Sequence, residues 1–238
     1  METRFKIAAS GTAVDEAGLK YDMSDFDGYA VETALQLNEK QGPGETVVIS
    51  LGPDVVQEQL RKALSMGADR AVQVKSDRVP VDGLSIARAL AAELKDGGYD
   101  LIFFGRQAVD SANATVGPMV AEMLNLPCAT GVSTLDIANG RGTARRDLEG
   151  AAEIVEFSLP AVVTIDEGMP RARYPSLKGI MAAKKKPLEV KPAQLGEEKL
   201  TLVKMELPPE RAAGRIVGEG PGAVAELVRL LHTEAKVL

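Results

Sequence analysis

The side chains that could carry chemistry are concentrated in one stretch of the sequence, GRQAVDSANATVG. The stretch begins at Gly105, where an apolar run ends, and Asp110, Ser111, Asn113 and Thr115 follow as the chain enters a helical pattern. Backbone N–H groups at the start of a helix favour an anion such as a phosphate, and these polar side chains could hold a phosphate or a ribose. An ordinary loop in which Asp110 or Ser111 caps the helix would look the same, so both interpretations stay open.

The rest of the sequence offers little catalytic chemistry. The 238 residues include one cysteine, Cys128, and one histidine, His232, which permit neither an intrachain disulfide nor a zinc ribbon. We therefore expect no catalytic residue and no metal site, and any reaction would belong to a bound cofactor. The net charge of -6 argues against a nucleic-acid partner. The absence of a long apolar run and of a signal-peptide pattern predicts an intracellular protein without membrane insertion.

Alternating strand and helix patterns would position the polar stretch. Strands are predicted at Arg4–Ala9, Thr46–Leu51, Arg70–Lys75, Asp100–Phe104 and Ala161–Ile165, and helices at Phe26–Gln41, Val55–Met66, Val81–Leu94 and Ala112–Leu124. This alternation implies a parallel sheet with helices on both faces. Right-handed crossovers make it an α/β fold, a Rossmann-like sandwich with a parallel core sheet of the adenine-nucleotide α-hydrolase-like kind. Val132–Ile137, Thr143–Leu148 and Glu153–Leu159 have the spacing of a small antiparallel addition.

The end of the chain differs in composition from what precedes it. Residues 192–221 are polar and punctuated by Pro208-Pro209, and Val224–Leu231 has the pattern of a short amphipathic helix. Such a segment has too little apolar content for a core of its own. We expect a nucleotide-binding α/β domain over residues 1–191 and an extended C-terminal arm over residues 192–238 that packs on a partner subunit.

Ligands of parallel α/β sheets bind beyond the carboxyl ends of the strands. Four segments would lie there: Ala8–Thr12, Ser50–Pro53, Gly105–Gly117 and the turn before Phe26. The topology therefore predicts a ligand site at this edge, independently of any motif.

Two stretches resemble a known family, the electron transfer flavoprotein β subunits. Ala144–Thr164 (ARRDLEGAAEIVEFSLPAVVT) is similar to the family signature of a basic residue, an acid, Gly-Gly, Glu, Pro, an aliphatic pair and Thr. Ala151 departs from it at the second Gly. Arg173–Glu189 (RYPSLKGIMAAKKKPLE) resembles the recognition loop of the family and its basic stretch, and Leu51–Ala71 also matches. The resemblance covers nearly the whole chain.

This resemblance implies an electron carrier subunit that makes no bonds of its own. It implies a heterodimer with an α subunit, an FAD shared with that subunit, and a structural AMP on the β subunit. Electrons would come from primary flavin dehydrogenases, such as acyl-CoA or amine dehydrogenases, and pass towards a quinone oxidoreductase. The location would be cytoplasmic, or the mitochondrial matrix in a eukaryote.

Carried over by position, the resemblance also implies site residues. The cofactor-binding residues would be Ala8, Ser24, Asp25, Phe26, Asp27, Leu51, Gly105, Arg106, Gln107, Ala108, Val109, Asp110, Ser111, Ala112, Asn113, Ala114, Thr115 and Val116. Phe26 would lie close to the dimethylbenzene ring of the flavin, and Asp147 would face an arginine of the α subunit near the flavin. Leu177 would insert into an apolar pocket of the dehydrogenase; without the resemblance, core packing would be the simpler interpretation of this residue.

Several positions depart from the family pattern. Ser10–Met23 is short and lacks the usual lysine, and Ser24-Asp25 replaces a common Asn-Pro. Residues 114–118 read ATVGP, whereas AMP-binding members often have Asn-Gln-Thr-Gly there. Electron-bifurcating members, which hold a second FAD in place of AMP, often have Val-Gly-Pro preceded by Gln. We favour AMP because bifurcating members usually keep the longer first loop. The alternatives are a bifurcating β subunit and a stress-type adenine-nucleotide-binding module.

Overall fold

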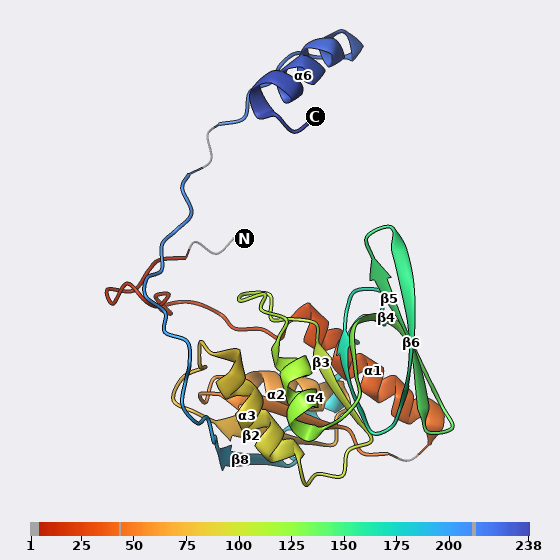
Figure 1. Ribbon diagram of the computed structural model, residues 1–238. Helices are drawn as coiled ribbons and strands as arrows, with labels where there is room; N and C mark the ends of the chain where they lie inside the picture. Colours follow the sequence, from red (N-terminus) through yellow and green to blue (C-terminus); the bar gives the residue numbers. More distant parts are fainter. Residues whose placement is uncertain (1–4, 43, 211–212) are drawn as a thin grey trace. The chain divides into compact units, whose positions relative to one another are not determined.

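The computed structural model describes residues 5–42, 44–210 and 213–238 and divides the chain into two units. The larger unit comprises residues 17–202. The smaller unit joins the N-terminal residues, up to residue 16, to residues 203–238. Figure 1 traces the chain through both units.

A three-stranded parallel sheet lies at one side of the larger unit. Its order is β1 (Val47–Gly52), β2 (Arg70–Lys75) and β8 (Leu188–Pro192). β2 is the central strand and is buried over four consecutive residues, as is typical of a parallel strand covered on both faces.

A five-stranded mixed sheet continues the unit. Its order is β3 (Leu101–Gly105), β7 (Ala161–Ile165), β4 (Cys128–Ala138), β5 (Arg141–Leu148) and β6 (Ala151–Ser158). The first three strands are parallel, and the last three form an antiparallel meander. The predicted antiparallel addition is therefore confirmed, and β7 has the predicted bounds because all five of its residues are buried.

Helices cover both faces of these sheets (Figure 1). α1 (Asp25–Gln41) packs on the five-stranded sheet, and α2 (Val56–Met66) packs on β1 and β2. On the opposite face, α3 (Gly83–Leu94) and α4 (Val116–Leu124) share one apolar cluster with residues of both sheets. A short helix, α5 (Leu177–Ala183), lies against α2.

Successive side chains of the central strands belong to different core clusters, one under each layer of helices. In β7, Val162 joins the cluster of α3 and α4, whereas its neighbour Val163 joins the cluster that contains α1. In β3, Ile102 and Phe103 divide in the same way, because successive side chains of a strand point to opposite faces. The predicted α/β, Rossmann-like class is confirmed.

The first predicted strand is wrong in the part of the chain that the structure describes; Arg4 lies outside it. Residues 5–9 form no ladder, and Ile7 makes an isolated antiparallel bridge with Val14. Phe5 is 55% exposed. With only Phe5 and Ile7 as large apolar side chains, this run has little to bury, and the chain turns back at Gly11, which has a positive φ.

The last predicted helix of the α/β pattern begins later than expected. α4 starts at Val116, whereas the pattern placed its start at Ala112. Ala112 and Ala114 both have left-handed φ values, 51° and 52°, which a right-handed helix cannot contain. The residues before Val116 therefore form a loop.

The chain remains attached to the larger unit well beyond residue 192. The Ala193 N–H donates to the Lys75 carbonyl (2.8 Å), and the Lys199 N–H donates to Oδ2 of Asp82 (2.7 Å). Oδ1 of the same carboxylate accepts from the Leu84 N–H (2.9 Å) and so caps α3. These backbone hydrogen bonds, Lys199 first, lower the pKa of Asp82. A buried aspartate thus ties residues 193–200 to the start of α3.

The smaller unit has little secondary structure. The Met205 N–H donates to the Gly11 carbonyl (2.8 Å), which joins its two segments. Its helix α6 (Val224–Leu230) buries Leu230 and leaves Val224, Leu227 and Val228 exposed. This unit therefore leaves one face of α6 without a covering element among the residues that the structure describes for it.

Candidate functional site

The turn at the start of α1 and the end of β3 meet at the carboxyl edge of the sheet. The Gly105 N–H donates to Oδ1 of Asp27 (3.0 Å), and the Ser24 hydroxyl donates to the Gln107 carbonyl (3.3 Å). Burial raises the pKa of Asp27, and the hydrogen bond from Gly105 opposes this shift only in part. Two segments 78 residues apart in the sequence are therefore joined into one structure.

Close approach of the backbones at this junction requires glycine. A Cβ added to Gly105 would lie 2.6 Å from Oδ1 of Asp27, 2.7 Å from its backbone nitrogen and 2.8 Å from the carbonyl carbon of Phe26. Two of these three atoms belong to the main chain, so no rotamer change can relieve the overlap. The first turn of α1 can rest on β3 only because residue 105 has no side chain.

The loop between β3 and α4 is the exposed part of the site. Arg106 holds its start, because its N–H donates to the Ile165 carbonyl (2.7 Å) and its guanidinium pairs with Asp166 (2.8 Å). Left-handed alanines are costly by about 1–2 kcal/mol each, and this loop contains two of them, Ala112 and Ala114. Strain of this kind is typical of loops that bind a ligand.

The loop leads directly into the N-terminus of α4. The cap residue is Thr115, and its hydroxyl makes no capping hydrogen bond. Asp110 and Ser111 are therefore not the helix caps; Oδ1 of Asp110 accepts from the neighbouring Ser111 N–H (2.7 Å). The Val116 and Gly117 N–H groups begin the first helical turn, where Pro118 has no N–H to offer. Together with an exposed loop rich in hydroxyl and amide groups, they suit a phosphate and a ribose. The residues present fit a nucleotide.

Two other expected cofactor residues are Leu51 and Ala8. The Leu51 side chain is buried in the core cluster with α3 and α4, so its backbone alone could face a ligand. Ala8 belongs to the smaller unit, where its N–H donates to the Ala13 carbonyl (2.8 Å). Within the larger unit, the structure joins Ser24–Asp27 to Gly105–Gln107.

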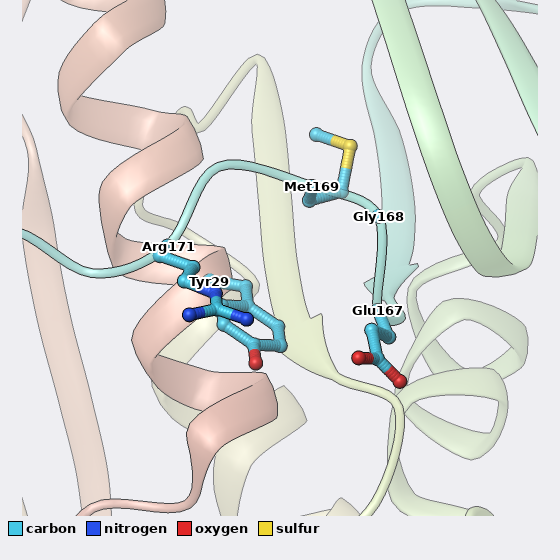
Figure 2. Close-up of a pocket in the computed structure, with 5 residues that line it drawn as sticks. All are labelled: Tyr29, Glu167, Gly168, Met169 and Arg171. Carbon is cyan, nitrogen blue, oxygen red and sulfur yellow. The ribbon is translucent and has the colours of Figure 1, made fainter.

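A shallow hollow of about 300 Å³ lies beside the start of α1 and was not predicted from the sequence. Its lining residues are Tyr29, Glu167, Gly168, Met169 and Arg171. Figure 2 shows the Arg171 guanidinium beside the Tyr29 ring, with the Glu167 carboxylate on the far side of the hollow. The Tyr29 ring also meets Phe26 edge to face, with the centroids 6.4 Å apart. The hollow thus adjoins the aromatic residue expected near the flavin.

Asp147 lies on β5 with its carboxylate exposed. Oδ2 accepts from the Ser133 hydroxyl (2.6 Å), and Oδ1 accepts from the Arg145 guanidinium (2.8 and 3.0 Å). These hydrogen bonds, Ser133 first, lower the pKa of Asp147, so the group stays ionised at neutral pH. A fixed negative charge on an exposed strand is suited to meeting a cation of a partner.

Leu177 is the first residue of α5 and is 84% exposed. The Ser176 hydroxyl caps this helix by accepting from the Gly179 N–H (3.0 Å). Tyr174 (97%) and Met181 (72%) are also exposed, so core packing does not explain Leu177. We call residues 171–183 the docking segment.

Other classes of site have little support in the described part of the chain. No group of three or more His, Cys, Asp or Glu side chains there is arranged to hold a metal ion. None of the helices described has the length and hydropathy needed to cross a bilayer. Cys128 is exposed, and burial of its thiol in part raises its pKa, which does not favour a nucleophilic thiolate.

Comparison with known proteins identifies close relatives of the chain. The family model described as "Electron transfer flavoprotein domain" matches residues 11–195. The chain is 38% identical to the electron transfer flavoprotein subunit beta of Bacillus subtilis over 247 residues, covering 100% of this chain and 96% of that protein. It is 36% identical to the human subunit beta over 231 residues, 94% and 91% of the two chains. The Methylophilus methylotrophus subunit beta is 41% identical over 194 residues, 79% and 74%.

Proposed function

The chain belongs to the family of electron transfer flavoprotein β subunits, and from this membership we propose that it pairs with an α subunit and passes electrons from primary flavin dehydrogenases towards a quinone oxidoreductase. Membership makes the chain an electron carrier subunit. The contact between Ser24–Asp27 and Gly105–Gln107 carries the finer proposal, because both segments belong to the nucleotide site that the resemblance implied.

In this proposal the loop at residues 105–116 holds an AMP. The N–H groups of the first turn of α4 would bind its phosphate, and the exposed polar side chains of the loop would bind its ribose. The strain at Ala112 and Ala114 supports the proposal, since a bound anion would offset its cost. The AMP would have a structural role, holding the ends of β3, α1 and α4 together.

The proposed FAD is shared with the α subunit. When bound, the flavin supplies the redox chemistry by accepting electrons and passing them on. Phe26 and the neighbouring Tyr29 would bound its dimethylbenzene edge, and the ionised Asp147 would pair with a cation of the α subunit. The chain itself makes and breaks no bonds; it orients the flavin and excludes water from one side of it. We place the complex in the cytoplasm, or in the mitochondrial matrix of a eukaryote.

Nucleotide analysis of the purified heterodimer tests this function. The chain would be co-expressed with the α subunit of its own source, and acid extraction should release one FAD and one AMP per heterodimer. Two FAD and no AMP would replace the proposal with an electron-bifurcating β subunit. A stable monomer that binds ATP and does not bind any α subunit would indicate a stress-type adenine-nucleotide-binding module instead.

Replacing Leu177 by alanine should weaken docking to the electron donor. Burying one leucine contributes about 1.5–3 kcal/mol, so we expect the KM of the dehydrogenase for the heterodimer to rise about tenfold or more, with unchanged FAD content. Stopped-flow and steady-state reduction by an acyl-CoA or amine dehydrogenase would measure it. Leu200→Ala is the matched control, because Leu200 is also an exposed leucine of the larger unit. Equal rates for Leu177→Ala and the unmutated protein would remove Leu177 from the docking site.

A further inference from the structure

The docking segment combines an exposed apolar surface with a firmly held backbone. Tyr174, Leu177 and Met181 are exposed, and exposed apolar side chains on a surface segment are usually mobile. Here, however, the side chain of Arg173, just before Tyr174, is one of the most heavily hydrogen-bonded of the larger unit. Arg173 joins the segment to α1.

Arg173 makes five hydrogen bonds to two glutamates on one side of α1. Its Nε and one terminal nitrogen donate to the two oxygens of Glu32 (2.8 and 2.9 Å), and its backbone N–H donates to Glu32 as well (3.2 Å). Its terminal nitrogens also donate to the two oxygens of Glu39 (2.6 and 3.1 Å). Two bidentate pairs fix the orientation of the planar guanidinium, which a single contact would leave free to turn.

One of these two pairs is buried. The Glu32 side chain is 3% exposed, whereas that of Glu39 is 58% exposed. Burial would raise the pKa of Glu32, but the hydrogen bonds from Arg173 and Gln36 outweigh it and lower the pKa. Without Arg173, a buried carboxylate would keep only the Gln36 hydrogen bond. The docking segment is therefore the source of the charge that Glu32 requires.

The other end of the segment is fixed to α2. A Cβ at Gly179 would overlap the backbone carbonyl oxygen of Ser65, so α5 lies in direct contact with α2. The Arg61 guanidinium donates to the Ala183 and Lys186 carbonyls (both 2.7 Å). The Lys186 ammonium in turn donates to three carbonyls at the end of α2, those of Leu64, Gly67 and Ala68. Lys186 therefore caps the C-terminal end of α2.

We propose that Arg173 is a positioning residue for electron-donor docking: it holds the docking segment on α1 so that Tyr174 and Leu177 are presented in their binding geometry before the donor arrives. The inference rests on the proposed docking function of Leu177. Its physical basis is preorganisation, because a segment that is already ordered loses less conformational entropy on binding. The partner chemistry that fits this surface is an apolar pocket, which takes Leu177 as its central side chain.

Arg173→Gln tests this role in the intact heterodimer. We expect a rise of about tenfold in the KM of the donor dehydrogenase for the heterodimer, with kcat and FAD content unchanged. Hydrogen exchange of the amides at 173–180 should become faster in the same variant. Arg173→Lys keeps the charge but cannot form two bidentate pairs, so it should give an intermediate KM.

Glu39→Gln provides a second test in case loss of the buried Arg173–Glu32 pair impairs folding. It weakens only the exposed pair, and we expect a smaller rise in KM together with faster exchange. Arg70→Gln, which removes another exposed Arg–Glu pair of the larger unit, should change neither quantity.

The outcomes separate the two proposals. If Leu177→Ala leaves KM unchanged, the docking function itself fails. If Leu177→Ala raises KM but Arg173→Gln and Glu39→Gln accelerate exchange without raising it, the docking site stands and the positioning role of Arg173 is rejected.

Discussion

A chain that ends at Leu202 is expected to fold but to lose its α subunit. The larger unit, residues 17–202, contains all three apolar clusters of the core. Positions 203–238 contribute no residue to these clusters. The deleted residues instead expose apolar side chains, among them Val203, Ile216 and three residues of α6. Surfaces of this kind are usually covered by a partner. We expect the yield of co-purified α subunit to fall at least about tenfold, a change of roughly 1.4 kcal/mol or more in binding.

The position of the cut matters for this experiment. Cutting after residue 191 would also remove residues 193–200, which Asp82 and the Lys75 carbonyl bind to the larger unit. Loss of the α subunit could then reflect damage to α3. A chain ending at Leu202 keeps those contacts, and circular dichroism should show an unchanged fold.

A full-length variant distinguishes the contribution of the exposed apolar side chains of the arm from the effect of shortening the chain. Replacing Val224, Leu227 and Val228 of α6 by serine should reproduce much of the loss. Replacing Glu226 and Arg229, an exposed ion pair on the same helix, by glutamine should not. A truncated chain that still co-purifies with the α subunit at full yield would show that the arm is not needed for assembly.

The core elements could be predicted because their patterns are long or strongly apolar. β7 is a run that is apolar except for Thr164 and is buried on both faces, and α1 and α2 carry their periodicity over 17 and 11 residues. Such signals survive in a single sequence because they depend on residues near one another along the chain. The meeting of the turn before Phe26 with the end of β3, at the carboxyl edge of the sheet, followed from the topology in the same way.

The elements that the sequence missed depend on distant contacts. β8 has five residues and is half exposed, and α5 has seven; each is too short to have a clear period. Both are stabilised by partners elsewhere, β8 by the β2 ladder and α5 by the close contact of Gly179 with α2. The error at residues 5–9 has the opposite cause, since a local β pattern was present without enough apolar side chains to bury.

The contacts that organise the functional surfaces were hidden for the same reason. Arg173 meets Glu32 across 141 positions, and Asp27 meets Gly105 across 78. In the sequence, these residues look like ordinary charges on a solvated helix and an ordinary strand end. Only the folded chain shows that Arg173 has a buried partner, Glu32, and that Asp27 has a half-buried one, Gly105. Each contact fixes a surface that the resemblance had placed at the donor or at the cofactor.

Gly105→Ala should have the largest effect of any single substitution considered for the nucleotide site. The added methyl group would overlap main-chain atoms of Phe26 and Asp27 as well as the Asp27 carboxylate, and it would break or lengthen the hydrogen bond from the Gly105 N–H. Overpacking of this kind costs about 1–3 kcal/mol, which lowers the Tm of a unit of this size by roughly 2–12 °C. Because α1 must then move away from β3, the AMP released on acid extraction should fall well below one per heterodimer.

A matched control distinguishes this steric effect from a general effect of replacing glycine by alanine. Gly214 has no atom within 4 Å of an added Cβ and no positive φ, so Gly214→Ala should leave both Tm and AMP content unchanged. If Gly105→Ala lowers the Tm while AMP stays at one per heterodimer, the junction of α1 and β3 serves stability alone, and the nucleotide must bind elsewhere. If neither quantity changes, the backbones at this junction have room to separate. The packing argument that places Ser24–Asp27 and Gly105–Gln107 in one site would then be wrong.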